Sequence, residues 1–172
     1  KLIPEEYLTY SNPGARIREK FIRKKIENFK SPMLDAGCGT GRLTEDRKVI
    51  GIDISFHKLV KSRERNRKGR YIICDIEGPV IFKSNFFNSV LLSEVIEHLK
   101  DPKNTLEKIY DIMKPEGKIL ITTPHKLRKS SKYLSTDVFR EFGVKQGIRG
   151  DLYDHRNFSS GELTDILKNA GF

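Results

Sequence analysis

The sequence has little of several residue types that mark particular classes of protein. Tryptophan is absent, glutamine occurs once, and only two of the 172 residues are cysteine. Neither Cys38 nor Cys74 has a second cysteine or a histidine at zinc-binding spacing, so the sequence indicates neither a disulfide scaffold nor a structural zinc site. Two reduced thiols are typical of a cytoplasmic protein, which is the location that we expect.

Long apolar runs are also missing. No stretch approaches the ~20 apolar residues that cross a bilayer, and we expect no secretory leader. The sequence contains no internal repeat and no low-complexity linker. A chain of this length buries roughly 70% of its unfolded surface on folding. We therefore predict one soluble domain over residues 1–172.

Acidic residues are outnumbered by basic ones, 23 against 33, which gives a formal net charge of +10. Lysine and arginine are concentrated in residues 14–30, 57–70 and 126–132. Such density favours a polyanionic partner, which is RNA, DNA or an anionic membrane surface. The alternative is that these charges form solvated faces of surface helices, since no RNA-binding module accompanies them. RNA therefore stays open as a partner.

A glycine-rich segment between two apolar runs is the most informative feature. Residues 35–41 read Asp-Ala-Gly-Cys-Gly-Thr-Gly after Leu34, and the next apolar run ends at Asp53. This order indicates a strand, a tight turn, a helix start and a second strand that ends in an acid. Glycines let the backbone approach a ligand where a Cβ would collide, and an acid at this spacing reaches a ribose. We predict a nucleoside-binding site at the mouth of a parallel sheet.

Strands and helices alternate along the rest of the chain. Further strands are predicted at about 49–53, 70–76, 89–93 and 118–124, and helices at about 40–47, 55–66, 102–113 and 159–170. Ser159 and Glu162 form a capping box, and Gly171 ends the last helix. Alternation with right-handed crossovers predicts an α/β fold with a doubly wound, mostly parallel sheet of order 3-2-1-4-5. The ligand is then expected at the carboxyl ends of strands one and four.

An amphipathic helix is predicted before the first strand, within an N-terminal helical segment 1–30. Asn12 and Pro13 suit the N-cap and the first helical position. Its apolar positions are interpreted as one stripe that packs on the sheet. This stripe comprises Ile17, Phe21, Ile22, Ile26 and Phe29.

Together these motifs resemble the class I methyltransferases that use S-adenosylmethionine, in particular the type 11 and quinone-biosynthesis group. The form Gly-x-Gly-x-Gly after Asp35 resembles that family's first motif, whereas dinucleotide-binding turns usually read G-x-G-x-x-G. Asp75-Ile76, the Glu-Val-Ile-Glu-His-Leu run at 94–99 and the turn at 113–117 follow in the family's order. The resemblance extends from residue 34 to residue 172 and implies a Rossmann-like fold.

The resemblance implies S-adenosylmethionine as the cofactor and assigns its contacts. Asp35 is expected at the methionine amine, Asp53 at the ribose and Asp75 at the adenine amino group. The cofactor-binding residues so implied are Asp35, Gly37, Cys38, Gly39, Gly41, Asp53, Ile54, Asp75, Ile76, Ser93 and Glu94.

The sequence departs from the family pattern at two places. Only 12 residues separate Gly41 from Asp53, so the helix at about 40–47 has hardly two turns. The sequence also stops at Phe172, where the family continues into a sixth and an antiparallel seventh strand. Strand five is then expected to have an unpaired edge, and a truncated chain, a divergent short form and an edge closed by a partner all remain open.

The segment from Glu94 to His98 has two interpretations. On a helix, Glu94, Glu97 and His98 share one face and with His155 suit a divalent ion, as in the small-RNA 2′-O-methyltransferases that this motif resembles. The same motif occurs in small-molecule methyltransferases that need no metal, and we expect the metal-free case. His98 and His155, followed by His125, are the candidate catalytic bases.

Residues 125–154 carry apolar side chains of their own between the fifth strand and the last helix. A structured insertion at this edge of an α/β sheet is typical of a lid or a substrate-binding surface. We predict methyl transfer to oxygen, nitrogen or carbon of a small-molecule acceptor. The alternatives are an RNA methyltransferase, with or without a metal, and a non-catalytic cofactor-binding module.

Overall fold

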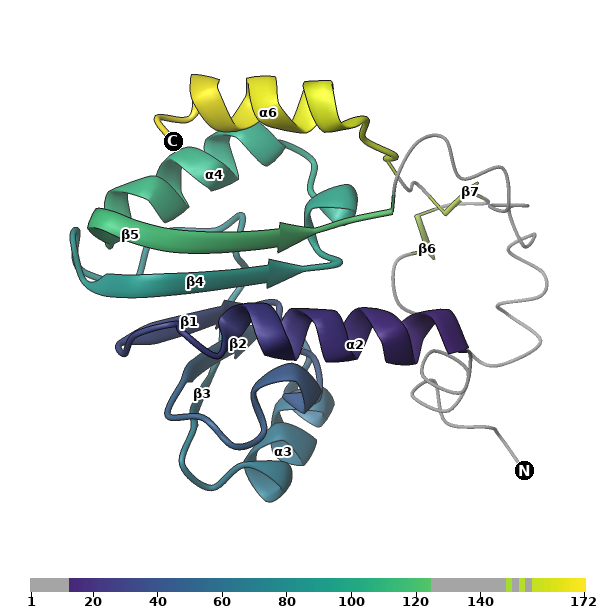
Figure 1. Ribbon diagram of the computed structural model, residues 1–172, viewed down its shortest axis with the longest axis vertical. Coiled ribbons are helices and arrows are strands. Elements are labelled where there is room, and N and C mark those ends of the chain that lie inside the picture. The colour runs from purple at the N-terminus through teal and green to yellow at the C-terminus, as the bar shows by residue number, and fades with distance from the viewer. Residues whose placement is uncertain (1–12, 125–147, 150–151, 154–155) are drawn as a thin grey trace.

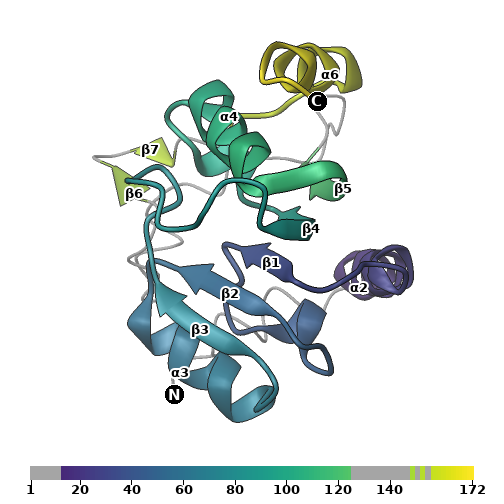
Figure 2. The ribbon, with the colours of Figure 1, turned by 90° about the vertical axis from the view of Figure 1, so that its left-hand side faces the viewer.

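The structure is a computed structural model that describes residues 13–124, 148–149, 152–153 and 156–172. A five-stranded sheet forms its centre, with the order β3-β2-β1-β4-β5 and parallel pairing between all neighbours. Figures 1 and 2 show the twist of this sheet and the helices that lie against it. The predicted Rossmann-like α/β fold and its strand order 3-2-1-4-5 are confirmed.

The five strands follow the predicted apolar runs, with changes at their ends. They are β1 Met33–Ala36, β2 Ile50–Asp53, β3 Arg70–Ile73, β4 Phe87–Ser93 and β5 Met113–Thr122. Strand β3 ends at Ile73, short of the predicted residue 76. Strand β5 begins at Met113, because Met113 pairs with Phe87 before the register shifts and Lys118 pairs with Ser89. The predicted turn at 113–117 is therefore the irregular start of this strand.

The helices are α2 Pro13–Ile26, α3 Phe56–Arg65, α4 Pro102–Ile112 and α6 Ser160–Asn169, with 3-10 turns η1 Arg42–Thr44 and η2 Ile96–His98. Side chains of Ser55, Asp101 and Ser159 cap α3, α4 and α6 by accepting backbone N–H groups. The capping box of Ser159 and Glu162 is confirmed, and Gly171 follows α6 with a φ of 103°. A short antiparallel pair, β6 Ile148–Arg149 and β7 Leu152–Tyr153, stands apart from the main sheet.

Two apolar clusters cover the two faces of the sheet. The larger one joins the sheet to α4 and α6, which stack together in Figure 1, and includes Val90 and Leu106. The smaller one joins α2 to the opposite face and includes Ile22 and Leu91. Neighbouring residues on β4 enter different clusters because successive side chains of a strand point to opposite faces. This burial on both sides explains the continuous apolar runs of the sequence.

The predicted apolar stripe of the first helix is wrong in part. Ile22 and Ile26 are buried, and Phe29 packs beside them. Ile17 and Phe21, however, are 70% and 53% exposed. At 3.6 residues per turn, Ile17 and Ile22 lie about 140° apart around the helix axis, so one face cannot bury both.

The predicted helix at 40–47 is also wrong, since only the 3-10 turn η1 forms there. The Asn66 amide donates to the carbonyl oxygens of Thr44 and Arg47, each at 2.8 Å. These carbonyls are therefore occupied by a side chain from the end of α3. Helix α2 holds η1 from the other side, where Arg42 Nε lies 2.8 Å from Glu19 Oε2.

Within the described ranges, β5 pairs with β4 alone, as expected for a sheet without sixth and seventh strands. None of the helices in these ranges has the length and apolar character that a membrane span requires. Asn12 and most of the predicted lid at 125–154 lie outside the described residues. The single-domain organisation and the lid therefore stay predictions.

Candidate functional site

The candidate site lies where the strand order reverses, at the carboxyl ends of β1 and β4. The glycine turn follows β1, and Glu94 follows β4, so the two chain segments flank the crevice between neighbouring strands. Both strands point toward the same edge of the sheet in Figure 1. In open parallel sheets this crevice is the usual ligand site.

The three glycines of the turn have different roles. All three have a positive φ, but a Cβ on Gly37 would lie 2.4 Å from Cγ2 of Val95, and one on Gly41 would lie 3.1 Å from the Ser62 side chain. These two glycines are needed for packing. Gly39 has a φ of 54°, and among the described residues no heavy atom beyond its two chain neighbours lies within 4 Å of the position that a Cβ would take. The described part of the chain therefore leaves the backbone of Gly39 open to the close approach of a ligand.

Asp53 fixes the peptide of Gly39 beside this open space. One carboxylate oxygen accepts the N–H of Gly39 at 2.9 Å, and the other accepts the N–H of Ser55 at 2.8 Å. The carbonyl of Gly39 in turn accepts the hydroxyl of Ser62 at 2.8 Å. Asp53 is half-buried, and a carboxylate oxygen that accepts one hydrogen bond has a lone pair left for another. Its predicted contact with a ribose hydroxyl thus fits the geometry and stays a prediction.

Asp35 supports the turn from beneath. Its side chain is buried, and one carboxyl oxygen accepts the hydroxyl of Thr44 at 2.7 Å. Burial raises its pKa to about 7, the hydrogen bond from Thr44 opposes this rise, and the negative charge of Asp53 adds to it. A positive group at the turn would stabilise the ionised form. The predicted contact with the methionine amine stays a prediction.

Cys38 acts as a packing residue in this turn. Its sulfur would lie 2.9 Å from a Cβ on Gly51, so the thiol occupies the space that this glycine leaves free. Burial, followed by the charges of Asp35 and Asp53, raises the pKa of the thiol well above its usual range. A protonated thiol is a poor nucleophile, which indicates that Cys38 contributes packing contacts and not covalent chemistry.

Apolar side chains are exposed next to the turn, at the end of β2. Ile54 is 68% exposed and Phe56 is 67% exposed. Asp75 and Ile76 follow β3, the neighbour of β2, and the Asp75 carboxylate accepts the N–H of Glu77 at 2.9 Å. An apolar surface beside an acid suits a flat base with an amino group. The predicted adenine contact of Asp75 and the predicted cofactor contacts of Ile54 and Ile76 stay predictions.

An ion pair between α2 and the residue that follows β4 was missed by sequence analysis. Arg18 of α2 donates from Nη1 to Oε2 of Glu94 at 2.8 Å, and the two side chains are 34% and 26% exposed. Glu94 has a φ of 55°, which turns the chain sharply after β4. Ser93 contacts Thr122, with 2.8 Å between the two hydroxyl oxygens. A cation and an anion side by side match the charges of an α-amino acid head group.

The predicted convergence of Glu94, Glu97 and His98 on one helical face is wrong. Residues 96–98 form a 3-10 turn, and Glu97 is buried with its carboxylate accepting the hydroxyl of Thr123 at 3.1 Å. Burial raises the pKa of Glu97 to about 7, with a contribution from Glu94. His98 is exposed, and the described part of the chain has no cluster of three or more potential metal ligands. His125 and His155 lie outside the described residues.

Comparison with known proteins supports the predicted resemblance to methyltransferases. A family model described as a methyltransferase domain matches residues 28–171. The mitochondrial ubiquinone biosynthesis O-methyltransferase of Rattus norvegicus is 31% identical over 63% of this chain and 34% of its own length. The Homo sapiens protein of that name is 34% identical over 81% of this chain and 40% of its own. The chain thus spans about a third of the length of the first of these relatives.

A solved structure shares the fold. The S-adenosylmethionine-dependent methyltransferase of Thermotoga maritima superposes with a TM-score of 0.73 at 22% identity, covering 97% of this chain and 74% of its own. The open space at Gly39, the acid at Asp53 and the charge pair of Arg18 and Glu94 all fit S-adenosylmethionine, which the family match supports as the cofactor. The chain belongs to the methyltransferase-domain family.

Proposed function

We propose that this chain binds S-adenosylmethionine across the carboxyl ends of β1 to β4 and transfers its methyl group to an oxygen of a small molecule. The observation that carries the proposal is the glycine turn: no described side chain covers Gly39, and Asp53 accepts its N–H at 2.9 Å. The ribose would lie beside Asp53 and the adenine beside Ile54 and Asp75.

Charge complementarity supports the position of the methionine end. S-adenosylmethionine carries an ammonium and a carboxylate on one carbon. Arg18 and Glu94 form a 2.8 Å ion pair in the free chain, and we infer that the amino acid head exchanges this pair for two new ones, carboxylate to Arg18 and ammonium to Glu94. Because the side chains are partly exposed, opening their pair costs little.

The sulfonium group supplies an activated methyl, so transfer is one displacement in which a C–O bond forms as the C–S bond breaks. The protein contributes by orienting the methyl group and the acceptor oxygen toward each other and by excluding water from them. The acceptor hydroxyl must also lose a proton, and His98 and His155 remain the proposed bases. His98 is exposed at the end of η2, close in sequence to Glu94. We expect this transfer to need no metal.

The substrate class is inferred from the relatives. Proteins named ubiquinone biosynthesis O-methyltransferase are 31% and 34% identical to this chain, which supports a small acceptor with a hydroxyl group. Both cysteines are free thiols, which supports the cytoplasm as the compartment.

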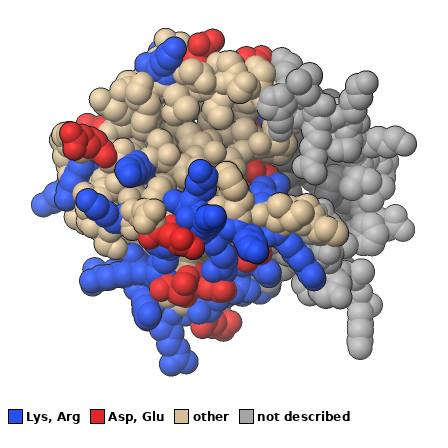
Figure 3. Space-filling view, viewed as in Figure 1, with Lys and Arg blue, Asp and Glu red and all other residues tan. Residues whose placement is uncertain are grey.

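RNA is a second candidate acceptor because basic side chains gather on one part of the surface. In Figure 3 lysine and arginine dominate around α2 and below it, although acidic side chains lie among them. The exposed basic residues of α2 and of residues 63–70 are Arg16, Lys20, Lys24, Lys25, Arg63, Arg65, Arg67, Lys68 and Arg70. Density of this kind favours a polyanion. The third cluster, at 126–132, lies outside the described residues.

Calorimetry with S-adenosylhomocysteine tests the proposal. We expect micromolar affinity, and we expect Asp53→Ala and Gly39→Val to weaken it at least tenfold, about 1.4 kcal/mol. Glu64→Ala, which removes an exposed carboxylate from α3, is the matched control and should leave affinity unchanged. Absence of binding to the folded chain, or equal binding by all variants, would contradict the proposed site.

A further inference from the structure

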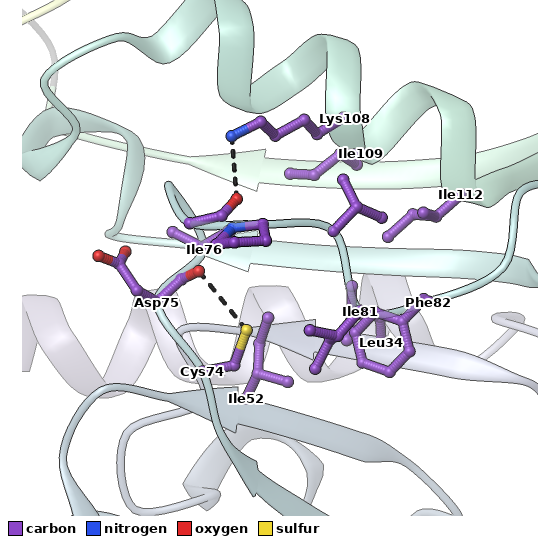
Figure 4. A pocket seen from close by; sticks show the side chains of 13 residues that line it. Leu34, Ile52, Cys74, Asp75, Ile76, Ile81, Phe82, Lys108, Ile109 and Ile112 are labelled. Carbon is purple, nitrogen blue, oxygen red and sulfur yellow. Dashed lines mark hydrogen bonds between the residues drawn. The ribbon is translucent and has the colours of Figure 1, made fainter.

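The segment between β3 and β4, residues 74–86, is fastened to α4 by a lysine. Lys108 extends from α4, and its Nζ donates to the carbonyl oxygen of Glu77 at 2.8 Å and to that of Gly78 at 2.9 Å. Figure 4 shows this side chain reaching across to the segment above the apolar residues of the sheet. Hydrogen bonds from an ammonium group are stronger than neutral ones.

The carboxylate of Glu77 fastens the same segment at a second point. Its Oε1 accepts the N–H groups of Lys100 and Asp101 at 2.7 and 3.1 Å, just before α4 begins. Asp75 forms the other half of this turn, because its carboxylate accepts the N–H of Glu77 and its carbonyl accepts the N–H of Gly78, both at 2.9 Å. The position of Asp75 therefore depends on Glu77 and Lys108.

Apolar packing holds only part of this segment, because Cys74, Ile76 and Phe82 contact the larger apolar cluster while the residues between Ile76 and Phe82 are more exposed. Residues 74–86 contain no helix or strand, and Val80 and Ile81 are 46% and 52% exposed. A cavity of about 30 Å³ lies beneath the segment, lined by Ile76 and by Ile109 and other residues of α4 and the sheet. Side chains around a cavity lose part of their contact energy, so the hydrogen bonds of Lys108 and Glu77 add to this packing in defining the backbone.

We propose that Lys108 and Glu77 are positioning residues that hold Asp75 and Ile76 in place to select adenine as the base of the cofactor. They act through the segment and not by contact with the reacting atoms. This inference rests on the proposed function, in which Asp75 meets the adenine amino group. Its consequence is that base selectivity depends on a side chain of α4.

Replacing Lys108 by methionine tests this, because methionine keeps an apolar stem and removes the donors. The probes are S-adenosylhomocysteine and S-inosylhomocysteine, which carries an oxygen in place of the adenine amino group. We expect the original chain to prefer the adenine ligand at least about tenfold (about 1.4 kcal/mol) and Lys108→Met to lose most of this preference. Lys108→Arg, which keeps the donors, should retain it.

Lys103→Met is the matched control, since Lys103 is exposed on the same helix and pairs with Glu107 at 3.4 Å. Glu77→Ala provides a second test from the opposite side of the contact and should also reduce the preference. Unchanged selectivity in folded Lys108→Met and Glu77→Ala, or equal loss in Lys103→Met, would overturn the inference. A merely structural role would lower stability without changing the ratio of the two affinities.

A readout without ligand separates this inference from the proposed function. Amide hydrogen exchange should become faster in residues 75–81 of Lys108→Met and stay unchanged in Lys103→Met. If the original chain binds neither nucleoside, the proposed function fails whatever the exchange shows. Exchange that is unaffected by Lys108→Met overturns the positioning role by itself.

Discussion

Replacing Asp35 by asparagine should stabilise the free chain at neutral pH. The Asp35 side chain is 3% exposed and accepts the Thr44 hydroxyl at 2.7 Å. Asparagine has nearly the same shape, and its carbonyl oxygen still accepts that hydroxyl. The substitution therefore removes a buried negative charge while the hydrogen bond remains.

The magnitude follows from the pKa of Asp35, which burial raises from 3.8 to about 7. Since the folded chain keeps this proton to higher pH than the unfolded chain does, stability falls as pH rises between about 4 and 7 and is level on either side. At 1.36 kcal/mol for each pH unit, a span of about 3 units corresponds to at most about 4 kcal/mol.

Urea unfolding of both chains between pH 4 and pH 8 measures this effect. Other titrating groups cancel in the difference, so the advantage of Asp35→Asn should grow with pH and level off above pH 7. Asp46→Asn, whose parent side chain is 76% exposed, is the control and should show no such trend. An advantage that does not change with pH, or that shrinks as pH rises, would refute the assignment of a buried, raised carboxyl.

Three further outcomes are expected. Glu97→Gln should also stabilise the chain as pH rises between 4.5 and about 7, because burial raises the Glu97 pKa; urea unfolding that shows a constant difference would contradict this. Gly37→Ala should lower the free energy of unfolding by about 1–3 kcal/mol, because the added Cβ clashes with Val95. Gly39→Ala should lower it by only about 1–2 kcal/mol, the cost of a left-handed backbone, but it should weaken S-adenosylhomocysteine binding, which calorimetry measures. Methyl transfer should persist in a chelator, and its loss with cofactor affinity intact would indicate a metal site.

The sheet and most helices could be predicted from the sequence because their signals are local. Strands β1, β2 and β4 lie in short apolar runs of the sequence. A strand that is buried on both faces appears as such a run, so it can be predicted without knowing which strands pair with it. Helix caps at Ser55 and Ser159 likewise depend on residues within one turn. The glycine turn was found for the same reason, since its motif is contiguous.

Features that depend on distant residues could not be predicted. The turn η1 replaces a helix because Asn66, beyond β2, occupies the carbonyls of Thr44 and Arg47. The pair of Arg18 and Glu94 joins residues 76 positions apart, and Arg18 is one of many basic residues on its helix. The prediction that Glu94, Glu97 and His98 share one helical face is wrong because their spacing suggests a helix, whereas Glu94 has a φ of 55°, which no α-helix allows.

The two buried acids, Asp35 and Glu97, lower the stability of the free chain at neutral pH. Asp35 is the last residue but one of β1, and Glu97 follows β4, so both acids lie near the crevice at which the strand order reverses. Burial raises both pKa values to about 7, so each acid lowers the stability of the free chain as pH rises from about 4 to about 7, and this loss is complete above pH 7. A purely structural role would be served by amides, which keep the hydrogen bonds to Thr44 and Thr123 without the charge. A positively charged ligand at this crevice would offset the loss, and a sulfonium with an ammonium group has that charge.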